Sequence, residues 1–172
     1  RARFHLQERE LAYATGKYMR HSFLSHSFEV DDVVGIVRLN FGGRVVFHDG
    51  DAELAPGINL HLAAGHSAGL QFVSVETQRG RLVLASDVTH YYENMDSGRP
   101  YTTTFHVGDT LESYEKLRAI ATSPEHIVPG HDPLVIEGSR EWPMTDAAHY
   151  LPANALGALD QLGLGEAVTA AA

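Results

Sequence analysis

The chain has no cysteine among its 172 residues. Disulfide bonds and thiolate metal ligands are therefore excluded, and a reducing compartment, the cytoplasm, is compatible with the composition without being demanded by it. Basic residues are also few, since 13 Lys and Arg face 22 Asp and Glu, for a formal net charge of -9. This balance opposes binding to phosphate backbones, so no nucleic-acid partner is expected. No apolar run is long enough to cross a bilayer, and no membrane partner is expected either.

Hydrophobic residues make up 44% of the sequence, which is enough for one domain with a buried core. No internal repeat or linker-like change of composition divides the chain. We therefore assign residues 1–143 to a single domain. Residues 144–172 are rich in Ala, Gly and Leu with few charges, and we expect a loosely helical tail there.

The apolar spacing predicts helices and strands in alternation. Helices are predicted at residues 7–20, 29–41 and 109–123. Strands are predicted within residues 44–51, 57–64 and 126–136, and a β-hairpin within 70–87 that turns at Gln78, Arg79 and Gly80. The third helix has an apolar face made of Leu111, Tyr114, Leu117, Ile120 and Ala121. This order of elements indicates a layered α/β architecture.

Three candidate ligands follow predicted strands, where loops carry functional groups on a rigid support: His66, Asp87 and His131. Small residues precede them and allow close backbone approach: Gly65, Ser86 and Gly130. Two imidazoles and a carboxylate are ligands that Zn²⁺ and similar ions take. A single histidine is weak evidence for a metal site. Eight other histidines are expected to be structural or exposed: His5, His21, His26, His48, His61, His106, His126 and His149. Of these, His61 is also a candidate for supporting the ligands from behind.

Three stretches resemble the metallo-β-lactamase-fold hydrolases, and more closely the N-acyl homoserine lactonases, which are quorum-quenching enzymes. They are "GHSAGLQFVSVETQRGRLVLASDVTHYYENM" at 65–95, "HIVPGHDPLV" at 126–135 and "FHLQERELAYA" at 4–14. The resemblance implies an αβ/βα sandwich with two adjacent metal ions, usually zinc. It places His66 and His131 each on one ion and Asp87 between both. It further implies that a metal-bound hydroxide opens a small-molecule lactone, and that Asp87 passes a proton to the leaving alkoxide.

The chain departs from the family in two places. The family's His-x-His-x-Asp-His motif is absent from the sequence. We therefore expect the chain to be the C-terminal portion of the fold, holding metal loosely and inactive alone. The second departure is His90, which stands where the lactonases carry a substrate-binding tyrosine. His90 is a catalytic candidate as a hydrogen-bond donor, with Tyr91, Tyr92 or a merely exposed helix-start histidine as alternatives.

Two interpretations are open for the aromatic-rich residues 13–28. They could line an acyl-chain pocket, or they could form the core of a helix, which the spacing favours slightly. The predicted function is a metal-dependent lactonase. The alternatives are a hydrolase of the same fold acting on γ-butyrolactone, a thioester or a phosphoester, and a non-catalytic relative that acts as a binding module. The sequence leaves open the acyl-chain preference, the metal and the oligomeric state.

Overall fold

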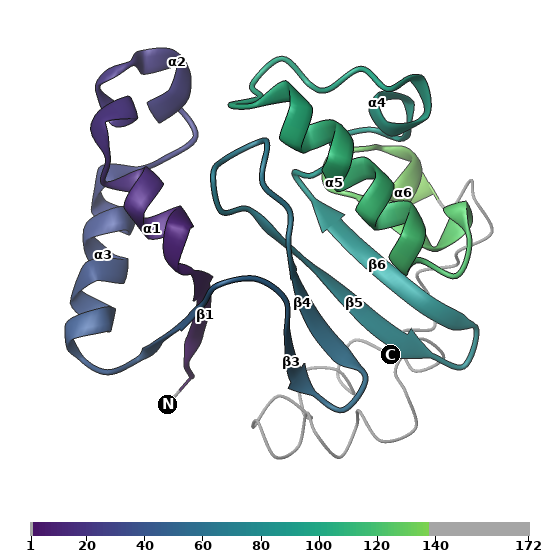
Figure 1. The fold of residues 1–172 in the computed structure, drawn as a ribbon, viewed down its shortest axis with the longest axis horizontal. Coiled ribbons are helices and arrows are strands. Elements are labelled where there is room, and N and C mark those ends of the chain that lie inside the picture. The colour runs from purple at the N-terminus through teal and green to yellow at the C-terminus, as the bar shows by residue number, and fades with distance from the viewer. Residues whose placement is uncertain (1, 138–172) are drawn as a thin grey trace.

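The computed structural model describes residues 2–137 of the chain. Residues 4–48 form an N-terminal unit, on the left of Figure 1. It has two strands, one before and one after its helices in sequence, which pair with each other in parallel. Its elements in order are β1 (Phe4–Gln7), α1 (Glu8–Ala14), η1 (Lys17–Arg20), α2 (Ser22–Ser25), α3 (Val30–Phe41) and β2 (Val45–His48). The helix predicted at residues 7–20 is thus two shorter helices, because the chain turns at Thr15 and Gly16.

A five-stranded sheet follows, with its strands in sequence order (Figure 1). They are β3 (Ala52–Ala55), β4 (Ile58–Leu62), β5 (Gln71–Thr77), β6 (Gly80–Ser86) and β7 (Ile127–Pro129). Neighbours are antiparallel except β6 and β7, which are parallel. A parallel pair needs a crossover, and this one contains α4 (Tyr92–Ser97), α5 (Val107–Ile120) and η2 (Pro124–His126). Helix α6 (Leu134–Glu137) is the last element of the described residues.

The hairpin of β5 and β6 turns where the sequence predicts it. Thr77 pairs with Gly80, which leaves Gln78 and Arg79 as the two-residue turn. Gly80 has a φ of +120°, a conformation that side chains rarely adopt.

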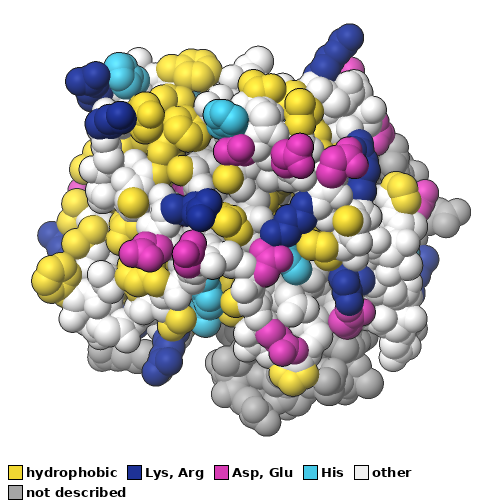
Figure 2. Space-filling model, viewed as in Figure 1, with side chains coloured by type: hydrophobic (Ala, Val, Ile, Leu, Met, Phe, Trp, Pro, Cys, Tyr) yellow, Lys and Arg dark blue, Asp and Glu magenta, His cyan; other side chains and the backbone are white. Residues whose placement is uncertain are grey.

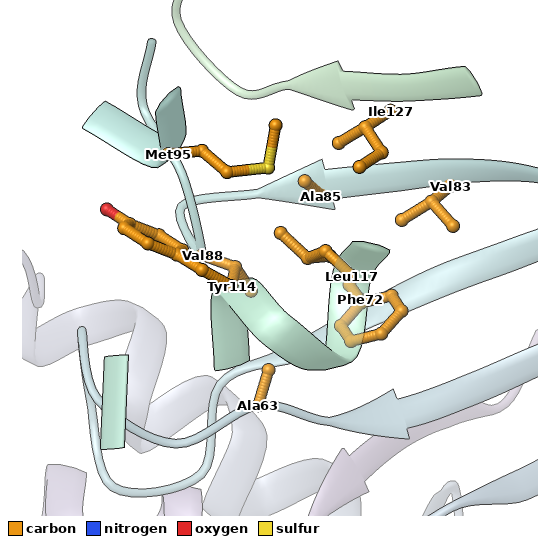
Figure 3. Packing of buried hydrophobic residues seen from close by; sticks show 9 residues of the cluster. All are labelled: Ala63, Phe72, Val83, Ala85, Val88, Met95, Tyr114, Leu117 and Ile127. Carbon is orange, nitrogen blue, oxygen red and sulfur yellow. The ribbon is translucent and has the colours of Figure 1, made fainter. Parts of the chain in front are cut away.

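The core lies between the sheet and helix α5, as Figure 3 shows. Tyr114 and Leu117 of α5 are buried against Phe72 of β5 and Val83 of β6. The predicted apolar face of this helix is wrong at Leu111, whose side chain is 38% exposed. Thr110 and Ser113 are buried in its place, because the first turns of α5 face a loop rather than the sheet.

The buried side chain of Gln7 bonds both the five-stranded sheet and the bend before it. Its Nε2 donates to Gln71 Oε1 of β5 at 3.3 Å and to the Gly50 carbonyl at 2.9 Å, and its Oε1 accepts from the Gly50 amide at 3.0 Å. Gln71 of β5 donates in turn to the His5 carbonyl at 2.9 Å. The N-terminal unit is therefore joined to the sheet by hydrogen bonds that water cannot reach at Gln7, whose exposure is 0%.

Hydrophobic side chains gather on the surface of the N-terminal unit, at the upper left of Figure 2. Phe41 is 90% exposed, Val30 74% and Phe23 60%, whereas Tyr13 is buried. The slight preference for a helix core in residues 13–28 is thus right for Tyr13 and wrong for Phe23. Within residues 2–137, no helix combines the length and hydrophobicity that a membrane crossing requires. The predicted tail at 144–172 and His149 lie outside the described residues.

A polar network holds α5 to the edge of β4. Lys116 Nζ lies 2.6 Å from Asp51 Oδ1, and His61 Nδ1 lies 2.9 Å from Asp51 Oδ2. Burial raises the pKa of Asp51, but the hydrogen bonds from Lys116, His61 and the Leu62 amide outweigh it and hold the pKa below its ordinary value. His61 Nε2 also bonds the buried Ser74 hydroxyl at 2.8 Å. His61 therefore belongs to this network and does not support the predicted ligands.

The lowered pKa of Asp51 makes its contribution to stability pH-dependent. We expect Asp51→Asn to lower the free energy of unfolding by about 1 kcal/mol at neutral pH, a value reduced by the partial exposure of the carboxylate. Because the pKa of Asp51 is lower in the folded state than in the unfolded state, where it is near 3.9, the ionised carboxylate stabilises the fold at pH values above the unfolded pKa. That stabilisation is lost as the pH falls through the folded pKa. Urea titrations at several pH values measure it. Asp49→Asn, exposed and two residues away, is the control; a loss equal at all pH values would contradict the assignment.

Candidate metal centre

The three candidate ligands lie at one edge of the five-stranded sheet. Strands β4 and β6 are both antiparallel to β5, and β7 is parallel to β6, so β4, β6 and β7 run in the same direction. Their C-terminal ends therefore meet at the same edge. His66 comes from the loop after β4, Asp87 directly follows β6, and His131 follows β7.

The carboxylate of Asp87 lies between two imidazoles. His131 Nε2 is 2.7 Å from Asp87 Oδ1, and His66 Nε2 is 3.9 Å from Asp87 Oδ2. Each oxygen of the carboxylate thus faces a different ring. The structure brings together the three residues that the sequence selects, and it does so with one histidine on either side of the acid.

His90 lies in the same cluster and is 8% exposed. Its ring centroid is 5.0 Å from that of His66 and 4.8 Å from that of His131, and the ring stacks on Tyr101 at 4.1 Å. Asp87, His90 and His131 each offer a ligand atom within 4.8 Å of the others. His90 is therefore not an exposed helix-start residue, since α4 begins two positions later at Tyr92. Tyr92 is itself buried.

Burial keeps two of the histidines neutral. It lowers the pKa of His90 to about 4, because the effect of burial, with smaller ones from His66 and His131, exceeds the opposing effect of Asp87. Burial likewise lowers the pKa of His66, against a smaller opposing effect of Asp87. At neutral pH both rings therefore carry one N–H donor and one free nitrogen acceptor, the form that binds metal ions.

The loops after β6 and β7 are joined through their backbones. The Gly130 amide donates to the Thr89 carbonyl at 3.1 Å, and the His131 amide donates to the His90 carbonyl at 3.0 Å. A Cβ on Gly130 would lie 2.7 Å from the Ser86 carbonyl oxygen and 3.2 Å from Asp87 Oδ1. Only glycine fits this approach. Ser86 itself has a φ of +49°, so the turn into Asp87 carries backbone strain.

The loop after β4 is held against the start of α5. The His106 amide donates to the Gly65 carbonyl at 2.8 Å, and the Phe105 amide donates to the His66 carbonyl at 3.3 Å. Gly65 has a φ of +136°, and a Cβ there would collide with Thr110. The glycine before His66 thus gives the loop both its conformation and its close contact with α5.

The chemistry of the donors at this cluster suits a divalent cation. Imidazole nitrogen and carboxylate oxygen are the donors that Zn²⁺ takes in proteins, and such atoms of Asp87, His90 and His131 converge here, in a group that does not include His66. In addition, His66 Nδ1 is buried and has no hydrogen-bond partner among the described residues. The nitrogen that faces Asp87 is Nε2, so a cation bound there would leave the unpaired Nδ1 as the second nitrogen of the ring.

A cavity of about 140 Å³ opens beside the cluster. Its polar wall includes His66, Asp87 and Glu10, and its apolar wall includes Tyr13, Phe23, Leu24, Phe28 and Leu70. The aromatic residues at 13–28 thus meet the candidate metal centre. Glu10 and Tyr101 were missed in the sequence, because nothing local distinguishes Glu10 from Glu8 or connects Tyr101 with His90.

The fold defined by this sheet, its helices and the residues at its edge is part of the metallo-β-lactamase fold. The chain superimposes with a TM-score of 0.63 and 22% identity on an N-acyl homoserine lactone hydrolase with N-hexanoyl-L-homoserine bound at its catalytic metal centre, covering 86% of this chain and 52% of that one. AidC, a dizinc quorum-quenching lactonase, gives a TM-score of 0.55 at 16% identity, over 75% of this chain and 47% of that chain.

In sequence, the chain resembles the N-acyl homoserine lactonases. It is 32% identical over 97 residues to the enzyme of Bacillus cereus, which covers 55% of this chain and 38% of that relative. The chain thus spans less than half the length of this curated relative. No family model matches the chain.

The contact at Gly130 yields a test of the site's geometry. We expect Gly130→Ala to lower the free energy of unfolding by about 1–3 kcal/mol, because the new methyl group would meet backbone atoms that cannot give way. Gly35→Ala in α3 is the matched control, since nothing lies within 4 Å of a Cβ there. That substitution should stabilise by about 0.5–1 kcal/mol. Urea denaturation followed by circular dichroism measures both. Equal stability of the two variants would contradict the close approach.

Proposed function

We propose that the protein is a metal-dependent hydrolase that opens the ring of N-acyl homoserine lactones. The observation that carries this proposal is the Asp87 carboxylate with one imidazole facing each of its oxygens, His66 on one side and His131 on the other. A carboxylate placed in this way suits two neighbouring cations. The similarity in sequence to N-acyl homoserine lactonases supports the choice of substrate class.

His66 and His131 would each bind one ion through Nε2, and Asp87 would bind both. Zinc is the expected metal, because AidC is a dizinc enzyme and the donors suit zinc; other divalent ions fit the same donors. When bound, such cations would lower the pKa of a water molecule and polarise a carbonyl group.

The protein's own residues would then handle the substrate. The neutral ring of His90 donates a hydrogen bond to the lactone carbonyl oxygen, where negative charge develops. Asp87 would accept the proton that the attacking water loses and pass it to the alkoxide that leaves when the ring opens. The product is a hydroxy acid, and no covalent intermediate with the protein is needed.

The acyl chain would lie along the apolar wall of the cavity. Phe23, Leu24 and Phe28 line this wall, and His66 and Asp87 line the same cavity. Phe23 is 60% exposed and so is available to contact a ligand. A longer acyl chain buries more apolar surface against these side chains and gains affinity by about 0.8 kcal/mol for each methylene buried.

We further infer that residues 1–143 act as one domain in this function. Hydrogen bonds of Gln71 in β5 with the Gln7 side chain and the His5 carbonyl join the N-terminal unit to the sheet, and the cavity is lined from both. Tyr13 and Phe28 come from the unit, whereas His66 and Asp87 come from the sheet.

The assignment of Asp87 is tested by Asp87→Asn in the complete gene product. We expect the metal content to fall from about two ions per chain and lactone opening to drop at least about 100-fold, since even residues that only support metal ligands cost 10–100-fold. Metal analysis and acid release from the lactone give the two readouts, and circular dichroism checks the fold. His126→Ala, distant in the fold at η2, should change neither readout. Full activity in Asp87→Asn would refute the proposed role.

The position of the acyl chain is tested by Phe23→Ala. We expect kcat/KM for a decanoyl substrate to fall about 10-fold while that for a butanoyl substrate changes little, because only the long chain reaches the lost ring. Phe41→Ala is the matched control, as Phe41 is 90% exposed on α3 and does not line the cavity. An equal loss for both substrates would place the acyl chain elsewhere.

A further inference from the structure

We propose that Glu10 is a positioning residue that fixes the loop carrying His66 and so directs the His66 ring toward Asp87. The inference rests on the proposed function, because it concerns a ligand of the same centre. Glu10 lies 56 positions before His66 in the sequence and on a different structural unit.

The carboxylate of Glu10 binds the loop at two points. Its Oε2 accepts a hydrogen bond from the Ser67 hydroxyl at 2.7 Å and another from the Gly69 amide at 2.8 Å. Ser67 is only 4% exposed, so the first of these bonds is shielded from water. Hydrogen bonds to an ionised carboxylate are the stronger kind, and two on one oxygen define the position of this half-buried group.

The backbones of the loop and helix α1 are also in close contact. A Cβ on Gly69 would collide with the Glu10 amide nitrogen and would lie 2.8 Å from the Glu10 Cα. Helix α1 is also held at its N-terminal end, because Gln7, directly before it, is hydrogen-bonded to Gly50. The carboxylate therefore transmits the position of a fixed helix to the loop.

The contacts of the loop divide at His66. Before it, Ser113 Oγ donates to the Ala64 carbonyl at 2.8 Å, and the His106 amide donates to the Gly65 carbonyl at 2.8 Å. At His66 itself, the carbonyl accepts from the Phe105 amide at 3.3 Å. After it, Glu10 accepts the hydrogen bonds of the Ser67 hydroxyl and the Gly69 amide, which are the bonds from outside the loop to these two groups among the described residues. The backbone of His66 is thus held by α5 and the residues before it on one side and by Glu10 on the other.

The orientation of the His66 ring depends on this support of its backbone. An imidazole that binds metal is usually oriented by a hydrogen bond to its second nitrogen. His66 Nδ1 has no such partner among the described residues. The direction of the ring therefore depends on the backbone that carries it, and Glu10 controls that backbone on one side.

The test is the affinity for Co²⁺, measured by titration of the apoprotein and by the visible spectrum of the bound ion. All variants are compared at a temperature where circular dichroism shows them folded. We expect Glu10→Ala to weaken the affinity about 10- to 100-fold and to alter the spectrum. Glu10→Gln should restore most of the affinity, because the amide oxygen accepts the same two hydrogen bonds. Glu8→Ala, exposed in the same helical turn, is the matched control and should bind like the wild type.

A double-mutant cycle separates positioning from a general loss of stability. Ser67→Ala removes one of the two hydrogen bonds and should weaken Co²⁺ binding about 3-fold or more, and its effect should not add to that of Glu10→Ala. Unchanged affinity in Glu10→Ala or in Ser67→Ala overturns the inference, and if Glu10→Ala does not fold, Ser67→Ala decides alone. If the wild type binds no Co²⁺, the proposed metal centre itself is wrong.

Discussion

The site depends on one steric constraint, the close approach of the turn after β7 to the end of β6. Gly130 lies where any side chain would meet the Ser86 carbonyl, and this allows the backbones of the two loops to bond each other at Thr89 and His90. His131 reaches Asp87 only because of that approach. The strain at Ser86 is tolerated because the parallel pairing of β6 and β7 holds both sides of the turn.

Around this contact, the candidate centre is assembled from parts of the chain that are far apart in sequence. The sheet supplies Asp87 and the histidines, helix α5 supports the loop before His66, and helix α1 supports the loop after it through Glu10. No single element therefore forms the candidate centre. Its geometry is set by the packing of the N-terminal unit on the sheet. Preorganisation of this kind is what metal and substrate binding require.

Local patterns in the sequence predicted most of the strands, the hairpin turn and helices α3 and α5, because alternation and helical spacing are properties of neighbouring residues. They also selected His66, Asp87 and His131 as residues at strand ends. The short elements β3, α2 and α6 were missed, since four residues carry too little periodicity. Contacts between distant residues were out of reach: the burial of His90 under Tyr101 and the bond of Glu10 to Ser67 exist only once the chain is folded.

The amide of Gln7 has a consequence for the chemical ageing of the protein. Its nitrogen donates a hydrogen bond to the Gly50 carbonyl, and its oxygen accepts one from the Gly50 amide, as peptide groups do in a sheet. Deamidation would replace the donating nitrogen with an oxygen that repels the Gly50 carbonyl, and would place a negative charge where no solvent reaches. A single slow hydrolysis at this side chain would thus weaken the contact between the N-terminal unit and the five-stranded sheet. The cavity, which both of them line, would lose part of its fixed shape.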